Sequence, residues 1–161
     1  MKKLIIINGT MGVGKTAVCS RLYKLLEHSV WLDGDWCWLM NPWDFSDENK
    51  SMVMDNISHL LRNYLANSSF QYVIFNWVMH EQVIFDELLQ RLEGYSFELI
   101  KISLTCPANE LVARMKSGGR EERVITDSLT RLPNYQRLDT IKVDTSNKSI
   151  DAVCREILLL I

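Results

Sequence analysis

The sequence predicts an α/β fold in which an open, mostly parallel sheet of five strands carries helices on both faces. Three observations lead to this prediction. Short runs of aliphatic and aromatic residues alternate along the chain with longer segments of helical periodicity. The first run, residues 3–7, is a compact stretch of Leu and Ile, which is typical of a strand covered on both faces. No repeat, low-complexity tract or linker breaks the alternation, so residues 1–161 are expected to form a single domain.

The expected strands are the compact apolar or β-branched runs of the chain. They cover residues 3–7, 30–32, 72–78, 97–104 and 140–143. The expected helices have apolar stripes at helical spacing. They cover residues 15–27, 47–65, 81–92, 107–115 and 150–160, and a charged, helix-prone stretch follows Ser117-Gly118-Gly119 as far as Tyr135. In a parallel sheet of this kind ligands bind at the carboxyl ends of the strands, where most polar clusters of this sequence fall.

Local signals support the boundaries of individual elements. Ser46 or Asp47 can cap the helix of residues 47–65, because both side chains accept hydrogen bonds from helix N–H groups. Gly94 follows the helix of residues 81–92 and can close it. Pro107 stands near the start of the next helix, where its missing N–H costs nothing.

Composition narrows the range of partners. The formal net charge of −2 leaves no basic footprint, so nucleic acid is not an expected partner. No apolar run is long enough to cross a bilayer, and the apolar start of the chain stops at Asn8-Gly9, too early for a signal peptide. The four cysteines lie far apart, which is typical of reduced thiols in a cytoplasmic protein. We therefore expect a cytoplasmic monomer or weak dimer.

One motif carries a clear chemical meaning. The segment from Gly9 to Thr16 fits the pattern G-x-x-x-x-G-K-[ST] in full and joins an expected strand to an expected helix. Its glycines let several backbone N–H groups face one anion, Lys15 can reach the β- and γ-phosphates of a nucleotide, and the Thr16 hydroxyl can bind Mg²⁺. The alternative is a glycine-rich turn with an incidental Lys-Thr pair. The expected nucleotide-binding residues are Gly9, Met11, Gly12, Val13, Gly14, Lys15 and Thr16.

With this motif in place, the chain resembles the branch of P-loop kinases that includes shikimate, gluconate, adenylylsulfate and nucleotide kinases and the chloramphenicol phosphotransferase. The resemblance covers the order of elements along essentially the whole chain. It implies a P-loop NTPase fold of the nucleoside-kinase type, a three-layer sandwich with a short lid at about residues 117–130. It also implies ATP and Mg²⁺ as cofactors and a small molecule as the acceptor of the phosphate.

Asp33-Gly34-Asp35 is similar to a segment that follows the second strand in gluconate and adenylylsulfate kinases. Transfer of a phosphoryl group to a hydroxyl needs charge stabilisation and a group that accepts the hydroxyl proton. We expect Asp35 to be the acceptor-side base and Asp33 to lie nearer the metal, although the two roles could be reversed. Taken alone, the same three residues would also suit an ordinary turn.

Three tryptophans, Trp36, Trp38 and Trp43, follow this segment in a stretch that should overhang the acceptor pocket. They can pack as part of the core, or they can bind a flat or apolar acceptor. Arg62, on the next helix, could bind an anionic acceptor or simply face solvent. His80, beyond the third strand, could exchange protons or serve as a helix-start residue.

The stretch after Gly119 is similar to the lid of adenylate kinase, although it is shorter. Arginine suits a transition state whose charge is spread over phosphoryl oxygens, because its planar fork donates hydrogen bonds in pairs. Arg120 and Arg123 are the expected catalytic arginines, Arg114 is expected near adenine, and Arg131 is a further nucleotide-binding candidate. The alternative is a charged surface helix whose acidic residues pair with these arginines.

These features predict an ATP-dependent phosphotransferase that moves the γ-phosphate to a hydroxyl or phosphate of a small metabolite, nucleotide or antibiotic. The expected catalytic residues are Lys15, Asp35, Arg120 and Arg123, and the expected metal ligands are Thr16 and Asp33. The alternative is a nucleotide-binding regulatory ATPase without an acceptor. The third strand ends in Asn76 instead of the aspartate that holds Mg²⁺ in many P-loop proteins, which disfavours a hydrolysing ATPase.

Overall fold

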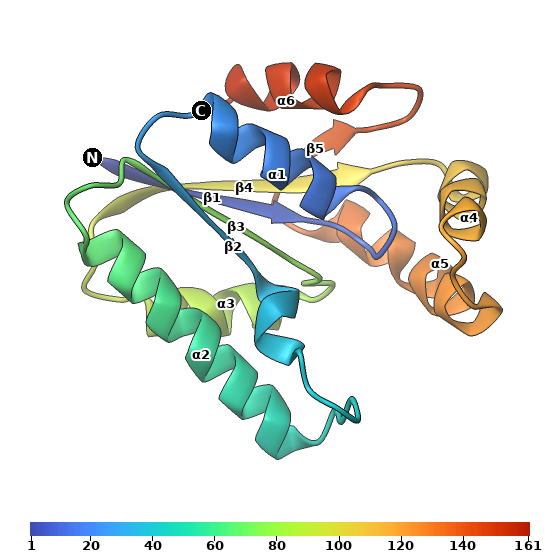
Figure 1. The fold of residues 1–161 in the computed structure, drawn as a ribbon, viewed down its shortest axis with the longest axis horizontal. Coiled ribbons are helices and arrows are strands. Elements are labelled where there is room, and N and C mark those ends of the chain that lie inside the picture. Colours follow the sequence, from blue (N-terminus) through green and yellow to red (C-terminus); the bar gives the residue numbers. More distant parts are fainter.

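A computed structural model describes all residues from Met1 to Ile161. Its five strands form one sheet in the order β2-β3-β1-β4-β5 (Figure 1). Every neighbouring pair is parallel, so the mostly parallel sheet that the sequence predicts is confirmed and is in fact wholly parallel. The strands are β1 (Lys2–Asn8), β2 (Ser29–Asp33), β3 (Tyr72–Trp77), β4 (Phe97–Thr105) and β5 (Ile141–Asp144).

Helices cover both faces of the sheet. In Figure 1, α1 and α6 lie on one face, α2 and α3 lie on the other, and α4 and α5 pack together beyond the carboxyl ends of the strands. The helices are α1 (Lys15–Leu25), the 3₁₀ helix η1 (Gly34–Trp38), α2 (Asp47–Ala66), α3 (Gln82–Arg91), α4 (Ala108–Ser117), α5 (Glu122–Arg137) and α6 (Ile150–Leu158). None of them combines the length and the apolar character that a membrane span requires.

Two apolar cores lie on opposite faces of the sheet, because successive side chains of a strand point to opposite faces. In β1, Ile5 and Ile7 belong to the core under α1 and α6, whereas Leu4 and Ile6 belong to the core under α2 and α3. All four side chains are fully buried. This double burial explains why the strand has no alternation of polar and apolar residues.

The element boundaries agree with those expected from the sequence to within a few residues. The Ser46 side chain accepts a hydrogen bond from the Asn49 N–H, as expected of a helix cap. Two differences are informative. The 3₁₀ helix η1 was not predicted, because it is too short to show periodicity. The expected lid, residues 117–130, spans the end of α4, a short turn and the first half of α5, and α5 then continues through Pro133 to Arg137.

Candidate functional site

The loop between β1 and α1 has the backbone of an anion cradle. Gly12 and Gly14 have φ angles of 86° and 106°, in the region that favours glycine. Gly14 caps α1 without a side chain, and no acidic residue occupies the first turn of this helix. A Cβ at Gly12 would lie 2.5 Å from the Met115 Cγ of α4, so the loop also needs glycine for close packing. The first-turn N–H groups of α1 are therefore available to a phosphate.

Lys15 is held inside this cradle. Its Nζ donates a hydrogen bond of 3.1 Å to the Thr10 carbonyl, and the residue is only 8% exposed. Burial lowers the pKa of Lys15 to about 8, and the negative charges of Asp35 and Asp33 partly oppose this shift. Burying an ammonium group without an ion pair is unfavourable, and a nucleotide phosphate can supply the missing negative charge.

Thr16 and Asp33 meet where α1 faces the end of β2. The Thr16 hydroxyl donates a hydrogen bond of 2.8 Å to the Asp33 Oδ2, and the Asp33 Oδ1 accepts one of 3.0 Å from the Asp35 N–H. Both groups are hard oxygen ligands, as Mg²⁺ prefers, but the protein has no cluster of three or more His, Cys, Asp or Glu that could hold a metal ion by itself. This pair fits a Mg²⁺ ion that keeps its waters and binds phosphate oxygens.

Asp35 is the second residue of η1 and is exposed. The surrounding protein still raises the pKa of Asp35 by desolvation, and the charge of Asp33 raises it further. Lys15 and Arg120 act in the opposite direction. A carboxylate with a raised pKa is a better proton acceptor than a free one. The structure thus brings Lys15, Asp33 and Asp35 together, as the sequence predicts.

The four predicted arginines have different positions. Arg114 donates hydrogen bonds to the Val13 carbonyl at 3.3 Å and to the Thr145 hydroxyl and carbonyl at 2.9 Å each, so it ties α4 to the P-loop and to the loop after β5. Arg120 is close enough to Asp35 for its charge to lower the pKa of that carboxyl. Arg123 is exposed and makes no hydrogen bond or ion pair. Arg131 lies near His80, whose pKa is lowered by desolvation and by the charge of Arg131.

Two contacts that shape the site could not be predicted from the sequence. Gly34 packs on Trp77 so closely that a Cβ at Gly34 would lie 2.5 Å from the Trp77 Cγ. Thr10 ties the P-loop to α5, since its hydroxyl donates a hydrogen bond of 3.0 Å to the Ser128 carbonyl. These contacts join segments that are far apart in the chain. Only the strand register, which pairs Asp33 with Asn76, would have revealed the first of them.

Asn76 occupies the end of β3 beside Asp33. Its Oδ1 accepts a hydrogen bond of 2.6 Å from the Trp31 indole N–H, whereas its buried Nδ2 has no partner. Buried amide donors are nearly always satisfied, so this N–H group calls for a water or a ligand atom. Asn76 thus remains a polar donor at the strand end where many P-loop proteins have a carboxylate.

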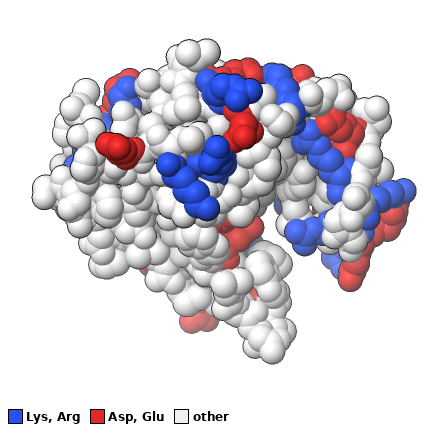
Figure 2. Space-filling model, turned by 45° about the horizontal axis from the view of Figure 1, so that its top comes forward, with Lys and Arg blue, Asp and Glu red and all other residues white.

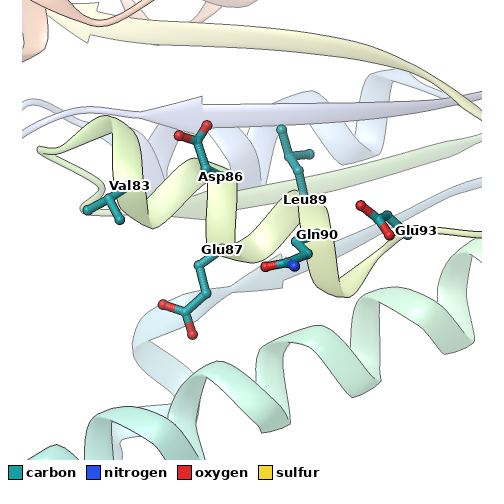
Figure 3. Close-up of a pocket in the computed structure, with 6 residues that line it drawn as sticks. All are labelled: Val83, Asp86, Glu87, Leu89, Gln90 and Glu93. Carbon is teal, nitrogen blue, oxygen red and sulfur yellow. The ribbon is translucent and has the colours of Figure 1, made fainter.

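An open pocket elsewhere on the surface does not belong to this site. Figure 3 shows it along α3, and none of its lining residues is a predicted site residue. They are Val83, Asp86, Glu87, Leu89, Gln90 and Glu93. One of the acidic side chains, Glu87, already pairs with Arg91 at 2.9 Å. The pocket is therefore a charged surface of α3 and lies apart from the P-loop.

Comparisons with known proteins agree with this fold. The family described as AAA domain matches residues 5–137. No curated protein sequence matches significantly. Among solved structures, the tunicamycin resistance protein of Deinococcus radiodurans is 19% identical with a TM-score of 0.74, and the match covers 99% of this chain and 95% of that one. A gluconokinase from Sinorhizobium meliloti 1021 is 16% identical, with a TM-score of 0.72 and coverage of 98% and 90%.

The Mycobacterium tuberculosis APS kinase CysC, solved in complex with AMPPNP and APS, is also similar. It is 16% identical with a TM-score of 0.70, over 99% of this chain and 96% of that one. Identities this low establish only the fold, which these three proteins share with our chain. The family match extends over well more than half of the residues. The chain therefore belongs to the AAA domain family and has its α/β P-loop fold.

Proposed function

We propose that the protein is an ATP-dependent phosphotransferase that moves the γ-phosphate of ATP–Mg²⁺ to a small acceptor. The observation that carries this proposal is the convergence of Lys15, Asp33 and Asp35 beside a P-loop whose helix N-terminus is free. Two carboxylates stand in one site, and only Asp33 is engaged by Thr16. That division leaves Asp35 open for an acceptor, which a protein that only binds nucleotide would not need.

Each residue has a role that follows from its position. The N–H groups of the loop and the Lys15 ammonium would hold the β- and γ-phosphates, and Thr16 with Asp33 would hold Mg²⁺, which offsets charge on the phosphates when bound. Asp35 would accept the proton of the acceptor hydroxyl as its oxygen bonds to phosphorus. The bond from the γ-phosphorus to the bridging oxygen breaks, and ADP leaves with those electrons.

The arginines divide between the two ends of the site. We assign Arg114 to the adenine side, because it holds the P-loop and the loop after β5 together. Arg120 is the first candidate for binding the transferred phosphoryl group, since its charge already acts on Asp35. Arg131 lies nearer His80 and the acceptor side. Arg123 would reach the phosphates only if α5 moved, and it stays the weakest of the four assignments.

The proposal is tested by measuring ADP formation with ATP, Mg²⁺ and a panel of hydroxylated metabolites, nucleosides and antibiotics. We expect ADP to form only when an acceptor is present, and we expect Asp35→Asn to abolish that turnover while ATP still binds. Asp86→Asn, an exposed change on α3 in the surface pocket apart from the P-loop, is the matched control. Steady hydrolysis of ATP without any acceptor, unaffected by Asp35→Asn, would favour the regulatory ATPase instead.

A further inference from the structure

The loop between η1 and α2 exposes an unusual amount of apolar surface. Leu39 is 76% exposed, Trp43 is 52% exposed and Phe45 is 59% exposed. These side chains are close together in sequence and carry no hydrogen-bond partners. Exposed aromatic groups that cluster, as opposed to single ones, are typical of binding surfaces. We call Leu39, Trp43 and Phe45 the aromatic platform.

The platform is anchored to the core. The Trp38 ring lies 5.0 Å from the Phe45 ring and 6.3 Å from the Trp43 ring, centroid to centroid, and the last two rings are 5.7 Å apart. Trp38 and Trp43 are nearly parallel, with an interplanar angle of 11°. Trp38 itself is only 6% exposed and belongs to the core under α2 and α3. The exposed rings are therefore presented in fixed positions, which reduces the entropy that binding costs.

The platform follows Asp35 closely along the chain. Trp38, whose ring contacts the Trp43 and Phe45 rings, comes three residues after Asp35 within η1, an advance of about 6 Å along a 3₁₀ helix. The two side chains differ in burial, since Asp35 is exposed and Trp38 belongs to the core. In the view of Figure 2 the loop lies in a mostly white projection across from the limb of α4 and α5, which carries many charged groups. An extended acceptor at Asp35 would thus be within reach of an apolar surface.

The platform has no cation for an anionic acceptor. The charged groups at the loop and the start of α2 are mostly acidic, and they are Asp44, Asp47 and Glu48. The one cation there, Lys50, pairs with Asp47 at 3.1 Å. Arg62 is far away, because α2 ends at the amino end of the sheet, where the Lys2 Nζ donates to the Phe70 carbonyl at 2.7 Å. The structure does not support the possible role of Arg62 in binding an anion.

We infer that the phosphate acceptor is an uncharged molecule with an aromatic or extended apolar body, which lies on Trp43 and Phe45 with its hydroxyl group toward Asp35. The inference rests on the proposed function and specifies its substrate class. An apolar body would bury the exposed rings, and each stacked aromatic pair adds to the gain from burial. A carboxylate or phosphate on the part of that body over the platform would meet Asp44 and Asp47, whereas Arg120 and Arg131 belong to α5 and the turn before it.

The inference is tested by calorimetry on the full chain with saturating AMPPNP and Mg²⁺. The probes are 2-(2-naphthyl)ethanol, which is neutral, and 2-naphthylacetate, which is its anionic counterpart. We expect the alcohol to bind at least tenfold more tightly than the acid, and we expect Trp43→Ala and Phe45→Ala each to weaken the alcohol at least tenfold. Val83→Ala removes a side chain that is 61% exposed on α3 and should change nothing.

The outcomes separate this inference from the proposed function. The inferred acceptor class is wrong, and the phosphotransferase proposal stands, if AMPPNP binds but the alcohol does not. The same holds if the alcohol binds Trp43→Ala and Phe45→Ala as tightly as the wild type. If AMPPNP itself fails to bind, the proposed function fails first. A third outcome is that the alcohol does not bind and that the wild type, but not Trp43→Ala, forms a dimer at high concentration. This would overturn the inference and indicate that a second copy of the chain covers the aromatic platform. Circular dichroism of both variants checks that they fold.

Discussion

The contact between Gly34 and Trp77 allows a sharp test of how the site is built. Gly34 separates the two aspartates, and its φ angle is one that alanine can adopt. A methyl group at this position would lie 2.5 Å from the Trp77 Cγ, 2.6 Å from its Cδ1 and 3.0 Å from its Cβ. Carbon atoms pack best at about 3.5–4.0 Å, so Gly34→Ala must displace one of the two groups by about 1 Å.

Either displacement has a measurable cost. Trp77 is 9% exposed and packs in the core beside Phe75, so its ring cannot move freely. Overpacking of this size destabilises a core by about 1–3 kcal/mol. We expect Gly34→Ala to lower the free energy of unfolding by about 2 kcal/mol in urea denaturation. If η1 moves instead of the ring, Asp35 shifts by about 1 Å, which can reduce acceptor-dependent turnover by about 100-fold.

Two further variants make the reasoning refutable. Gly34→Ala combined with Trp77→Leu should recover part of the lost turnover, because the smaller side chain makes room for the methyl group. Gly118→Ala is the matched control for stability, because Gly118 has a φ angle of −80° and a Cβ there would approach no atom closer than 3.4 Å. If Gly34→Ala lowers the unfolding free energy no more than Gly118→Ala does and leaves turnover at the wild-type level, the packing argument is wrong.

Three other predictions follow from single contacts. Burial lowers the pKa of His80, so the unfolded chain takes up the proton first. As the pH falls below about 6.5, urea titrations should show the wild type losing stability relative to His80→Gln, and equal losses in the two proteins would contradict this. Thr10→Val removes the hydrogen bond to the Ser128 carbonyl, so it should lower the free energy of unfolding by about 1 kcal/mol and speed hydrogen exchange in α5. Unchanged exchange there would show that the bond does not hold α5. Chelation of Mg²⁺ by EDTA should stop turnover but leave the melting temperature of the nucleotide-free protein unchanged, because no cluster of side chains holds a metal ion by itself. A large drop in the melting temperature would contradict this.

The sequence predicted those features that depend on local chemistry. The strands are apolar at successive positions because both faces of the sheet are covered, and the P-loop must have glycine where its φ angles are positive. Asp33 and Asp35 could be placed because the second strand ends there and the carboxyl ends of parallel strands share one edge. These inferences needed no knowledge of distant contacts.

What the sequence could not reveal depends on contacts between distant segments. The sheet register pairs Asp33 with Asn76 and so brings Gly34, just after β2, against Trp77 at the end of β3, and nothing near either residue signals this contact. The sequence ranked Arg120 and Arg123 first among the arginines, but the position of Arg123 depends on the rotation of α5, which the sequence analysis did not use. That rotation buries Ile125 and Tyr135 and leaves Arg123 exposed. A helical phase fitted to Ile125, Ser128 and Tyr135 would have ranked Arg123 lower.

The position of α5 also relates the two sides of the site. Ile125, near its start, belongs to the core under α1 and α6, whereas Tyr135, near its end, belongs to the core under α2 and α3. Between them the Ser128 carbonyl accepts the hydrogen bond from Thr10 of the P-loop. A movement of the lid that separates α5 from one core must therefore also disturb its contact with the P-loop or with the other core. We therefore expect closure over a nucleotide to involve the turn of residues 118–121, at the exposed end of α5, more than the helix as a whole.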